Sequence, residues 1–334
     1  MVNDKRRKKS YGLSFLSGLA LAMVLPAFCA QAQTKWPQRP VTMVVSQPGG
    51  ASPDVMARMI SDRIAPHLGQ PMVIENKPGG GNVIGALAAA RAAPDGQTLY
   101  FATSAAMVLN PFLMENLPYD PLKDFVPIAF IAHSHQLLVA APNVPATNLR
   151  ELIELDRKTP GKLSIAVDGP RNLAGIIAAA INVRAGTNFV LVPYSNIGAG
   201  VQDVMAGRVE AGVFSTSIVE ALMREGKLKP LALVADQPVA ALPNIPLAKS
   251  DVPGLAFGGW FMILAPTGTP PAIIAQLNTA IGEALRDKAV TDLAPKLGFD
   301  LGSGSRTPDD ATAFLKREYD LWRETIKSLG FKPQ

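Results

Sequence analysis

Short apolar runs alternate with longer segments of helical period along most of the chain. Residues 41–45, 72–75 and 99–102 are short and largely apolar, so each predicts a strand. Residues 53–68 repeat apolar side chains with helical spacing, and residues 83–93 are rich in alanine, so both predict helices. Strands that alternate with helices in this way are typical of a parallel sheet covered by helices on its faces.

The same alternation restarts further along the chain. More strands are expected at residues 136–141, 163–167, 189–193, 211–214 and 231–235. More helices are expected at residues 149–157, 173–183, 198–205, 218–225, 271–286 and 308–328, with a shorter one near 289–296. The proline-rich segment 238–253 is interpreted as a connection between lobes. Two α/β lobes of similar size would enclose a cleft, with ligands at the carboxyl ends of the parallel strands.

The first 32 residues predict a secretory signal. Five basic residues at 5–9 precede an apolar run at 13–28, which ends in the small-x-small sequence Ala30-Gln31-Ala32. We therefore expect cleavage after Ala32 and a periplasmic location. The alternative is an uncleaved anchor, although Pro26 and the shortness of the run disfavour a span. Phe28 before Cys29 disfavours a lipoprotein.

Removing that segment changes the charge of the chain. The full sequence carries 32 basic and 27 acidic residues, whereas residues 33–334 carry 27 and 26, a net charge of +1. This nearly neutral charge removes the main support for a nucleic-acid partner, because nucleic-acid binding requires a basic face in the mature protein. The single cysteine, Cys29, lies in the signal, so the mature chain has no thiol for a disulfide or a metal.

Four predicted strand-to-helix turns are small and polar, and they are the candidate binding elements. They are residues 46–54, 103–106, 168–172 and 194–198. Gly49 and Gly50 would allow a ligand close to the backbone, and Ser52 is expected to be the N-cap of the helix that follows. Helix-start amides favour anions, so the four turns together predict a pocket suited to a carboxylate. The alternative for the first turn is an ordinary glycine-rich turn with a capping serine.

The sequence offers little support for catalysis or for a cofactor. No nucleophile elbow, phosphate loop or zinc-binding helix is present. His133 and His135 would share one face of a strand and could form a metal pair, but a surface or hinge location is favoured because no further ligand lies nearby in sequence. Asp54 could be a general base, but its place early in a helix favours interaction with the helix dipole. We expect no catalytic residue, no metal and no cofactor.

A series of short motifs runs in order along the whole mature chain. It comprises Trp36-Pro37-Gln38-Arg39-Pro40, Pro48-Gly49-Gly50 with Asp54 and Arg58, Leu68-Gly69-Gln70-Pro71, Glu75-Asn76-Lys77-Pro78-Gly79-Gly80-Gly81, Pro94-Asp95-Gly96, Asn110-Pro111, Leu117-Pro118-Tyr119-Asp120-Pro121, Pro160-Gly161-Lys162-Leu163, Val192-Pro193-Tyr194 and Ala265-Pro266-Thr267-Gly268-Thr269-Pro270. With these motifs the chain resembles the Bug family of receptors, the extracytoplasmic subunits of tripartite tricarboxylate transporters.

The resemblance implies an α/β, type II periplasmic-binding-protein fold with two lobes and a hinge. Lobe 1 is expected to comprise residues 33–136 and 253–334, and lobe 2 residues 137–252, with the hinge near Gln136 and Pro253. The resemblance also implies that the turns at 46–54 and 194–198 hold a small organic carboxylate, either a dicarboxylate or an aromatic acid. The partners implied are that ligand and the membrane permease subunits. Independently of the resemblance, the absence of cysteine and of a second long apolar segment in the mature chain leads us to expect a soluble monomer.

Two positions depart from the family pattern. Receptors of this family usually have a small Ser/Gly-rich turn at 168–172, and often an acidic residue where this chain has Ser215. Arg171 could therefore pair with a second ligand carboxylate, or it could point to solvent or pair with Asp168. The full set of expected ligand-binding residues is Ser46, Gln47, Gly49, Gly50, Ser52, Asp54, Ser104, Asp168, Arg171, Asn172, Tyr194, Ser195, Gly198 and Ser215.

Three functions remain open from the sequence. The first is a receptor that delivers its ligand to a transporter. The second is a sensor subunit that binds the same ligand and docks to a signalling partner. The third is a periplasmic enzyme, which the absence of a catalytic constellation disfavours.

Overall fold

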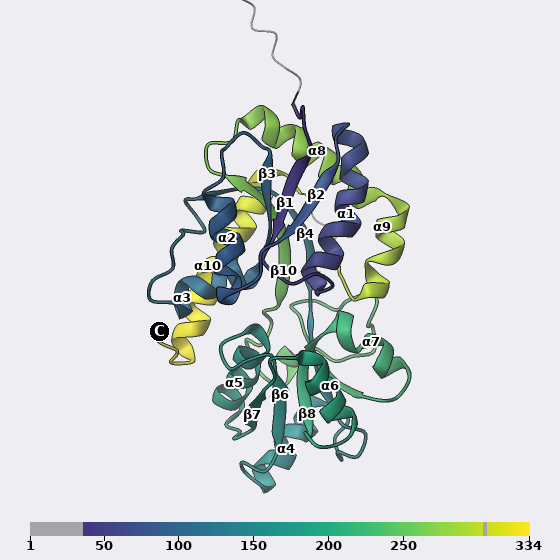
Figure 1. The fold of residues 1–334 in the computed structure, drawn as a ribbon. Helices are drawn as coiled ribbons and strands as arrows, with labels where there is room; N and C mark the ends of the chain where they lie inside the picture. Colours follow the sequence, from purple (N-terminus) through teal and green to yellow (C-terminus); the bar gives the residue numbers. More distant parts are fainter. Residues whose placement is uncertain (1–35, 303–305) are drawn as a thin grey trace, which may run out of the picture. The chain divides into compact units, whose positions relative to one another are not determined.

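The computed structural model describes residues 36–302 and 306–334, and their strands form two separate sheets (Figure 1). The predicted signal and its cleavage site lie outside the described residues. Among the residues described, no helix is long and apolar enough to cross a membrane.

The first sheet has the strand order β2-β1-β3-β10-β4. Its strands are β1 (Val41–Val45), β2 (Met72–Asn76), β3 (Thr98–Thr103), β4 (Phe125–Ser134) and β10 (Gly259–Pro266). β1 runs parallel to β2 and β3, whereas β10 is antiparallel to β3 and β4. β1 and β3 are almost entirely buried because helices cover both faces of the sheet, which explains their apolar sequences.

Helices on the two faces of this sheet bury separate apolar clusters. One cluster joins α1 (Ser52–Leu68) to α8 (Pro271–Arg286) through side chains such as Met56, Ile60 and Leu277. The other brings together α2 (Val83–Ala90) and α10 (Pro308–Ser328). Shorter elements complete this lobe: Gly80–Asn82, a π-helical turn at Ala105–Leu109, α3 (Asn110–Leu113), α9 (Lys288–Leu293) and Pro295–Leu297.

The second sheet has the strand order β7-β6-β8-β5-β9. Its strands are β5 (Gln136–Ala140), β6 (Ser164–Val167), β7 (Val190–Pro193), β8 (Ala211–Ser215) and β9 (Lys229–Val234). β6 is parallel to β7 and β8, and β5 is antiparallel to β8 and β9. The helices of this lobe are α4 (Leu149–Lys158), α5 (Leu173–Ala185), α6 (Ile197–Met205) and α7 (Thr216–Arg224), with a short turn at Ala248–Ser250.

The chain passes between the two sheets at two connections. β4 leads into β5 through the single residue His135, and residues 235–258 lead from β9 back to β10. The C-terminal helices therefore pack on the lobe in which the described chain begins (Figure 1). Pro253 lies inside the second connection, and Gln136, the first residue of β5, directly follows the first. The predicted hinge and lobe boundaries stay predictions.

Most of the predicted elements are confirmed, and the differences have local causes. The strand β4 was not assigned, because its ten residues include Pro127 and show no clear alternation of apolar and polar side chains. The segment 289–296 is a helix followed by a separate turn, since Pro295 lacks the amide needed to continue the helix. Helix α2 ends at Ala90, three residues before the predicted end.

Candidate functional site between the two lobes

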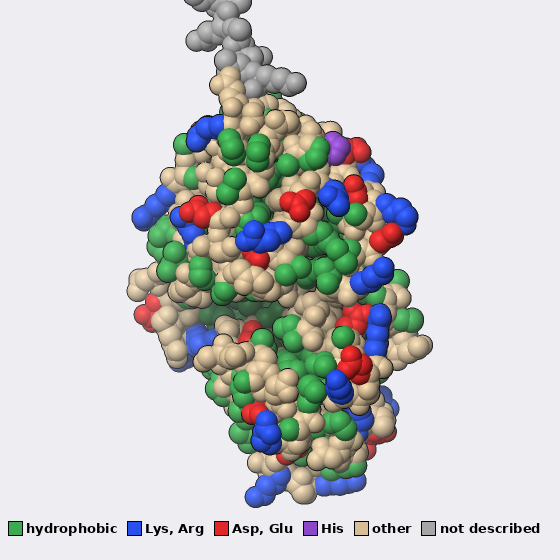
Figure 2. Space-filling model, turned by 45° about the vertical axis from the view of Figure 1, so that its right-hand side comes forward, with side chains coloured by type: hydrophobic (Ala, Val, Ile, Leu, Met, Phe, Trp, Pro, Cys, Tyr) green, Lys and Arg blue, Asp and Glu red, His purple; other side chains and the backbone are tan. Residues whose placement is uncertain are grey.

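A cavity of about 570 Å³ is lined by residues of both sheets and their helices. A space-filling view shows a hollow across the face of the molecule, with hydrophobic side chains inside it (Figure 2). Ser134, Gln136 and Gly259 line the cavity where the chain crosses between the sheets. Its volume lies within the range typical of small-molecule sites.

Four helices begin at this cavity. Its lining includes Ser52 and Pro53 of α1, Leu173 and Ala174 of α5, Ile197 and Gly198 of α6, and Ser217 and Ile218 of α7. The first amides of a helix have no partner within the helix, and the helix dipole is positive at this end. Four such starts in one cleft create an environment that favours a negatively charged group.

The turn before α1 is organised by Asp54, which is 2% exposed. Its carboxylate accepts hydrogen bonds from the Gly50 amide at 2.8 Å, from Asn76 Nδ2 at 2.8 Å and from Arg58 Nε at 3.0 Å. Burial opposes ionisation of Asp54, but the hydrogen bonds from Arg58, Gly50 and Asn76 outweigh it and lower the pKa of the carboxyl. Asp54 thus lies in the first turn of α1, as the dipole interpretation requires, and its bonds fix the backbone at Gly50.

The prediction that Ser52 caps α1 is wrong. The N-cap is Ala51, no side-chain cap bond is present at this helix start, and Ser52 is already helical. The helix begins one residue earlier than expected because Pro53 fits the second helical position as readily as the first. The Ser52 hydroxyl instead lies 2.8 Å from the hydroxyl of Ser217 in α7 and so joins the two lobes.

Asp168 lies between β6 and α5, and its side chain faces the cavity. Asp168 is exposed to the solvent of the cleft, but the protein atoms around its carboxyl partly desolvate it and raise its pKa to about 6, although its own amide and those of Ala174 and Gly175 favour the charged form. The last two amides belong to the first turn of α5. The Asp168 carboxylate therefore occupies the anion-binding end of this helix.

Half of the expected ligand-binding residues line the cavity. They are Gln47, Gly50, Ser52, Ser104, Asp168, Gly198 and Ser215. The structure thus brings together parts of all four predicted turns. The other seven lie outside the lining: Ser46, Gly49, Asp54, Arg171, Asn172, Tyr194 and Ser195.

Comparison with known proteins places the chain in a family. A model for the tripartite tricarboxylate transporter family receptor matches residues 56–331, which is most of the chain. The chain belongs to this receptor family. The Bug protein BugT of Bordetella pertussis is 33% identical over 299 residues, covering 89% of this chain and 91% of BugT. The predicted resemblance is thereby confirmed.

Solved structures of receptors agree with the fold. Rpa4515 of R. palustris with adipate superposes with a TM-score of 0.80 and 29% identity, covering 90% of this receptor and 100% of that chain. The periplasmic binding protein BugD superposes with a TM-score of 0.78 and 28% identity, covering 90% and 100%. The predicted two-lobed binding-protein fold is confirmed. Members of the family are periplasmic solute receptors and not enzymes, which agrees with the expectation that this chain is not an enzyme.

Several expected site residues have structural partners elsewhere in this receptor. The Ser46 hydroxyl is buried 2.7 Å from the hydroxyl of Tyr100. The Tyr194 hydroxyl donates to Asp203 Oδ2 at 2.6 Å, and Asn172 Nδ2 donates to the carbonyl of Asp168 at 2.9 Å. These bonds hold the turns in shape.

Arg171 neither points to solvent nor pairs with Asp168. Its guanidinium reaches the other lobe and donates to the carbonyl of Leu113 at 2.9 Å and to that of Lys332 at 2.6 Å. It also lies 5.7 Å from the ring centre of Phe331. The Leu113 carbonyl lies at the end of α3 and also accepts a hydrogen bond from the Gln334 amide at 3.1 Å, and Lys332 follows the end of α10. Arg171 thereby joins the lobes at a place outside the cavity lining.

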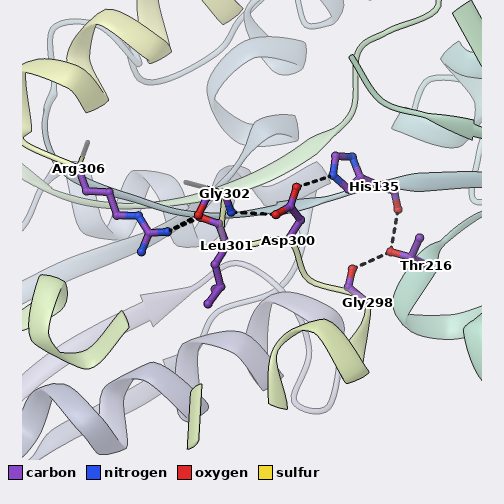
Figure 3. A network of polar contacts seen from close by, with 7 residues as sticks. All are labelled: His135, Thr216, Gly298, Asp300, Leu301, Gly302 and Arg306. Carbon is purple, nitrogen blue, oxygen red and sulfur yellow. Dashed lines mark hydrogen bonds and ion pairs between the residues drawn. The ribbon is translucent and has the colours of Figure 1, made fainter. Parts of the chain in front are cut away.

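The first connection between the lobes contains a polar network (Figure 3). His135 Nε2 lies 3.2 Å from Asp300 Oδ2, and the Thr216 hydroxyl donates to the carbonyl of Gly298 at 2.7 Å. The hydrogen bond with His135 is the main cause that lowers the pKa of Asp300 to about 2, against the opposing effect of burial. The network ties the connection to the segment that follows α9.

His135 forms the first connection between the two sheets, and the half-buried His133 lies two residues before it in β4. His135 is buried, and its ring stacks on that of His133 with centroids 5.4 Å apart. Burial, with a smaller effect from the charge of His135, lowers the pKa of His133 to about 4. Within residues 36–302 and 306–334, no group of three or more His, Cys, Asp or Glu side chains could hold a metal ion.

Sequence reasoning missed several cavity residues. Ser217 follows β8 in the run Phe214-Ser215-Thr216-Ser217, and the rule that selected the other four strand-to-helix turns applies here as well. Trp260 and Phe261 come from β10, which the sequence analysis did not assign as a strand. Phe299 follows the last short turn of the C-terminal region, and no local pattern places it in a cleft.

Proposed function

We propose that this receptor captures a small organic carboxylate in the periplasm and delivers it to the membrane subunits of a tripartite transporter. The observation that carries the proposal is the convergence of helix starts from both lobes, those of α1, α6 and α7, on one cavity between the lobes. Hydroxyls of Ser52, Ser104 and Ser217 supply further donors. Dipoles and hydroxyls of this kind suit a carboxylate without requiring a lysine or arginine.

The ligand carboxylate would contact both lobes. We place it between the start of α1, at Gly50 to Ser52, and the starts of α6 and α7, at Gly198 and Ser217. The bond between the hydroxyls of Ser52 and Ser217 supports this placement, because it brings α1 and α7 within hydrogen-bonding reach of one another. A ligand that contacts both lobes stabilises the closed state, because the open state lacks some of these contacts and binds the ligand less tightly. The adipate of the similar receptor Rpa4515 supports a linear organic acid as one ligand type.

A thermal-denaturation screen with organic acids tests the binding proposal. The protein is residues 33–334, and the probes are dicarboxylates, aromatic acids, simple monocarboxylates and ω-amino monocarboxylates at neutral pH. A ligand at a hundred times its dissociation constant should stabilise the protein by about 2.7 kcal/mol. Small-angle scattering of the stabilised sample should show a smaller radius of gyration. Failure of every acid to stabilise the protein would contradict the proposal.

Delivery to a transporter requires a separate test. Cells that lack this receptor should lose uptake of the acid found in the screen, and restoring the receptor should restore uptake. Uptake that persists without the receptor would argue against its role in delivery.

A further inference from the structure

The cavity has an unusual charge for a site that favours anions. Among the described residues that line it, Asp168 is the only one with an ionisable side chain. The other polar lining residues carry neutral amides or hydroxyls: Gln47, Ser52, Thr103, Ser104, Ser134, Gln136, Ser215 and Ser217. No lysine or arginine in the described lining can balance a second negative charge.

Asp168 itself occupies one of the four helix starts, so this start is not available to a ligand anion. The amides of Ala174 and Gly175 at the start of α5 favour its carboxylate, so this end already has an anion. Within the described chain, no Lys, Arg or His forms an ion pair with Asp168. The nearby Arg171 is directed away from it, to the carbonyls of Leu113 and Lys332. The carboxylate of Asp168 thus faces the ligand space without a cationic partner from the protein.

The consequences for a ligand follow from Coulomb's law. A second carboxylate near Asp168 would meet a like charge in a partly shielded cleft, where repulsion is stronger than in open water. A protonated nitrogen at the same place would gain a charge-assisted hydrogen bond. The raised pKa of Asp168 agrees with this picture, because it reports a carboxylate that lacks a compensating positive charge.

We propose that Asp168 selects the far end of the ligand, so that this receptor prefers a monocarboxylate bearing a positively charged nitrogen over a dicarboxylate. The inference rests on the proposed function, because it takes the first carboxylate as bound at α1, α6 and α7. Asp168 would be the specificity-determining residue of the site, and the ligand nitrogen would serve as its missing partner.

The test uses matched ligands in calorimetry at pH 7.5. Linear dicarboxylates of four to eight carbons are compared with ω-amino monocarboxylates and plain monocarboxylates of the same lengths. For the chain length that binds best, the amino acid should bind about tenfold more tightly than the dicarboxylate. The variant Asp168→Asn should reduce that ratio about tenfold, since the amide can still accept the bonds from Ala174 and Gly175 but carries no charge.

Two controls separate charge at the site from other effects. Glu154→Gln removes one negative charge from an exposed position on α4 and should leave the ratio unchanged. Asp168→Ser provides a second variant with a small polar side chain, and circular dichroism checks that each variant is folded. A purely structural role of Asp168 would weaken all ligands equally and would leave the ratio of affinities as it is.

The possible failures can be told apart. If dicarboxylates bind as tightly as amino acids of equal length, or if Asp168→Asn leaves the ratio unchanged, the selection proposal is overturned while the proposed function stands. Tight dicarboxylate binding with uptake of a proton would show that Asp168 acts as a neutral carboxyl donor, and it would overturn the proposal too. If none of the carboxylates binds, the proposed function fails and the inference fails with it.

Discussion

Two aspartates lie beside helix starts in the two lobes, and the protein holds them in opposite ways. Asp54, in the first turn of α1, is almost fully buried, yet Arg58, Asn76 and the Gly50 amide surround it and lower its pKa. Asp168, before α5, faces the cavity without a cation, and its pKa is raised to about 6. Burial alone therefore does not decide the charge state of a carboxyl group, because the partners of the group decide it.

The difference separates a structural role from a recognition role. The bonds of Asp54 are all used within the protein, where they shape the Gly50 turn and leave no capacity for a ligand. Asp168 keeps an unbalanced charge at the site where a ligand is proposed to lie. Substitutions at each aspartate and at its neighbours therefore test the structural role of Asp54 and the recognition role of Asp168 separately.

The largest effect is expected when the partners of Asp54 lose their acceptor. Asp54→Ala leaves the Gly50 amide, Asn76 and Arg58 without it, and should lower the free energy of unfolding by about 3 kcal/mol at pH 7. Urea denaturation measures this loss. Asp62→Ala, at an exposed position of the same helix, is the control and should change stability by less than ~0.5 kcal/mol. Equal effects of the two substitutions would contradict the structural role given to Asp54.

The turn that Asp54 holds can also be altered from its backbone. Gly50 has φ of 83°, in the left-handed region that a β-branched residue avoids, and it lines the cavity. An added Cβ meets no atom within 4 Å, so Gly50→Val would act through backbone strain of about 1–3 kcal/mol and through bulk toward the ligand. We expect ligand affinity to fall at least about tenfold in calorimetry.

The neighbouring glycine is a matched control for that substitution. Gly49 has no positive φ, lies outside the cavity lining, and would place a Cβ 3.9 Å from Asn76 Oδ1. Gly49→Ala should therefore bind the ligand as the wild type does. The binding role of the turn is refuted if Gly50→Val is folded by circular dichroism and retains wild-type affinity.

The same turn shows how far the sequence could be interpreted. A strand, a Gly-Gly pair and a helical segment with proline predict a backbone close to a ligand, and the cavity does include Gly50 and Ser52. The role of Asn76 could not be predicted, because its contact with Asp54 requires β2 to lie beside β1. Local patterns place residues at turns, but pairing of strands decides which turns share a network.

The directions of long side chains also could not be predicted from the sequence. Tyr194 and Arg171 belong to turns that were correctly located, yet the first donates to Asp203 and the second reaches the C-terminal segment. Both targets lie on elements whose position depends on tertiary packing. The departure at Asp168 was visible in the sequence, whereas its lack of a cationic partner emerged only from the fold.

A smaller effect is expected at the contact between the lobes. Ser52→Ala removes the bond to Ser217 but, because Ala51 is the N-cap, it removes no helix cap. Ligand affinity should weaken by about 0.5–1.5 kcal/mol, the usual contribution of one neutral hydrogen bond. Ser52→Thr keeps the hydroxyl and should bind more tightly than Ser52→Ala. Identical affinities for these two variants would mean that the hydroxyl contact does not support closure.

The smallest effect concerns the stability of the ligand-free protein and isolates the charge of Asp168. Its pKa is about 6 in the fold and about 3.8 when unfolded, so the native state holds the extra proton between these pH values. The contribution of Asp168 to the free energy of unfolding of the wild type therefore decreases as pH rises from about 4 to about 6. Asp168→Asn does not ionise, so its stability relative to wild type should rise across this window, by less than about 1 kcal/mol because the group faces solvent in the cleft.

The comparison must be made as a difference between proteins, because another group titrates over the same range with the opposite sign. His133, with a pKa lowered to about 4, makes stability increase as pH rises from about 4 to 6.5. This contribution is common to wild type and Asp168→Asn and cancels when urea denaturation curves of the two are subtracted at each pH. Glu154→Gln, at an exposed position on α4, is measured in the same way as the control for the loss of one carboxylate. A flat difference for Asp168→Asn would mean that its carboxyl ionises as freely as one in water, and the contrast with Asp54 would then rest on the partners of Asp54 alone.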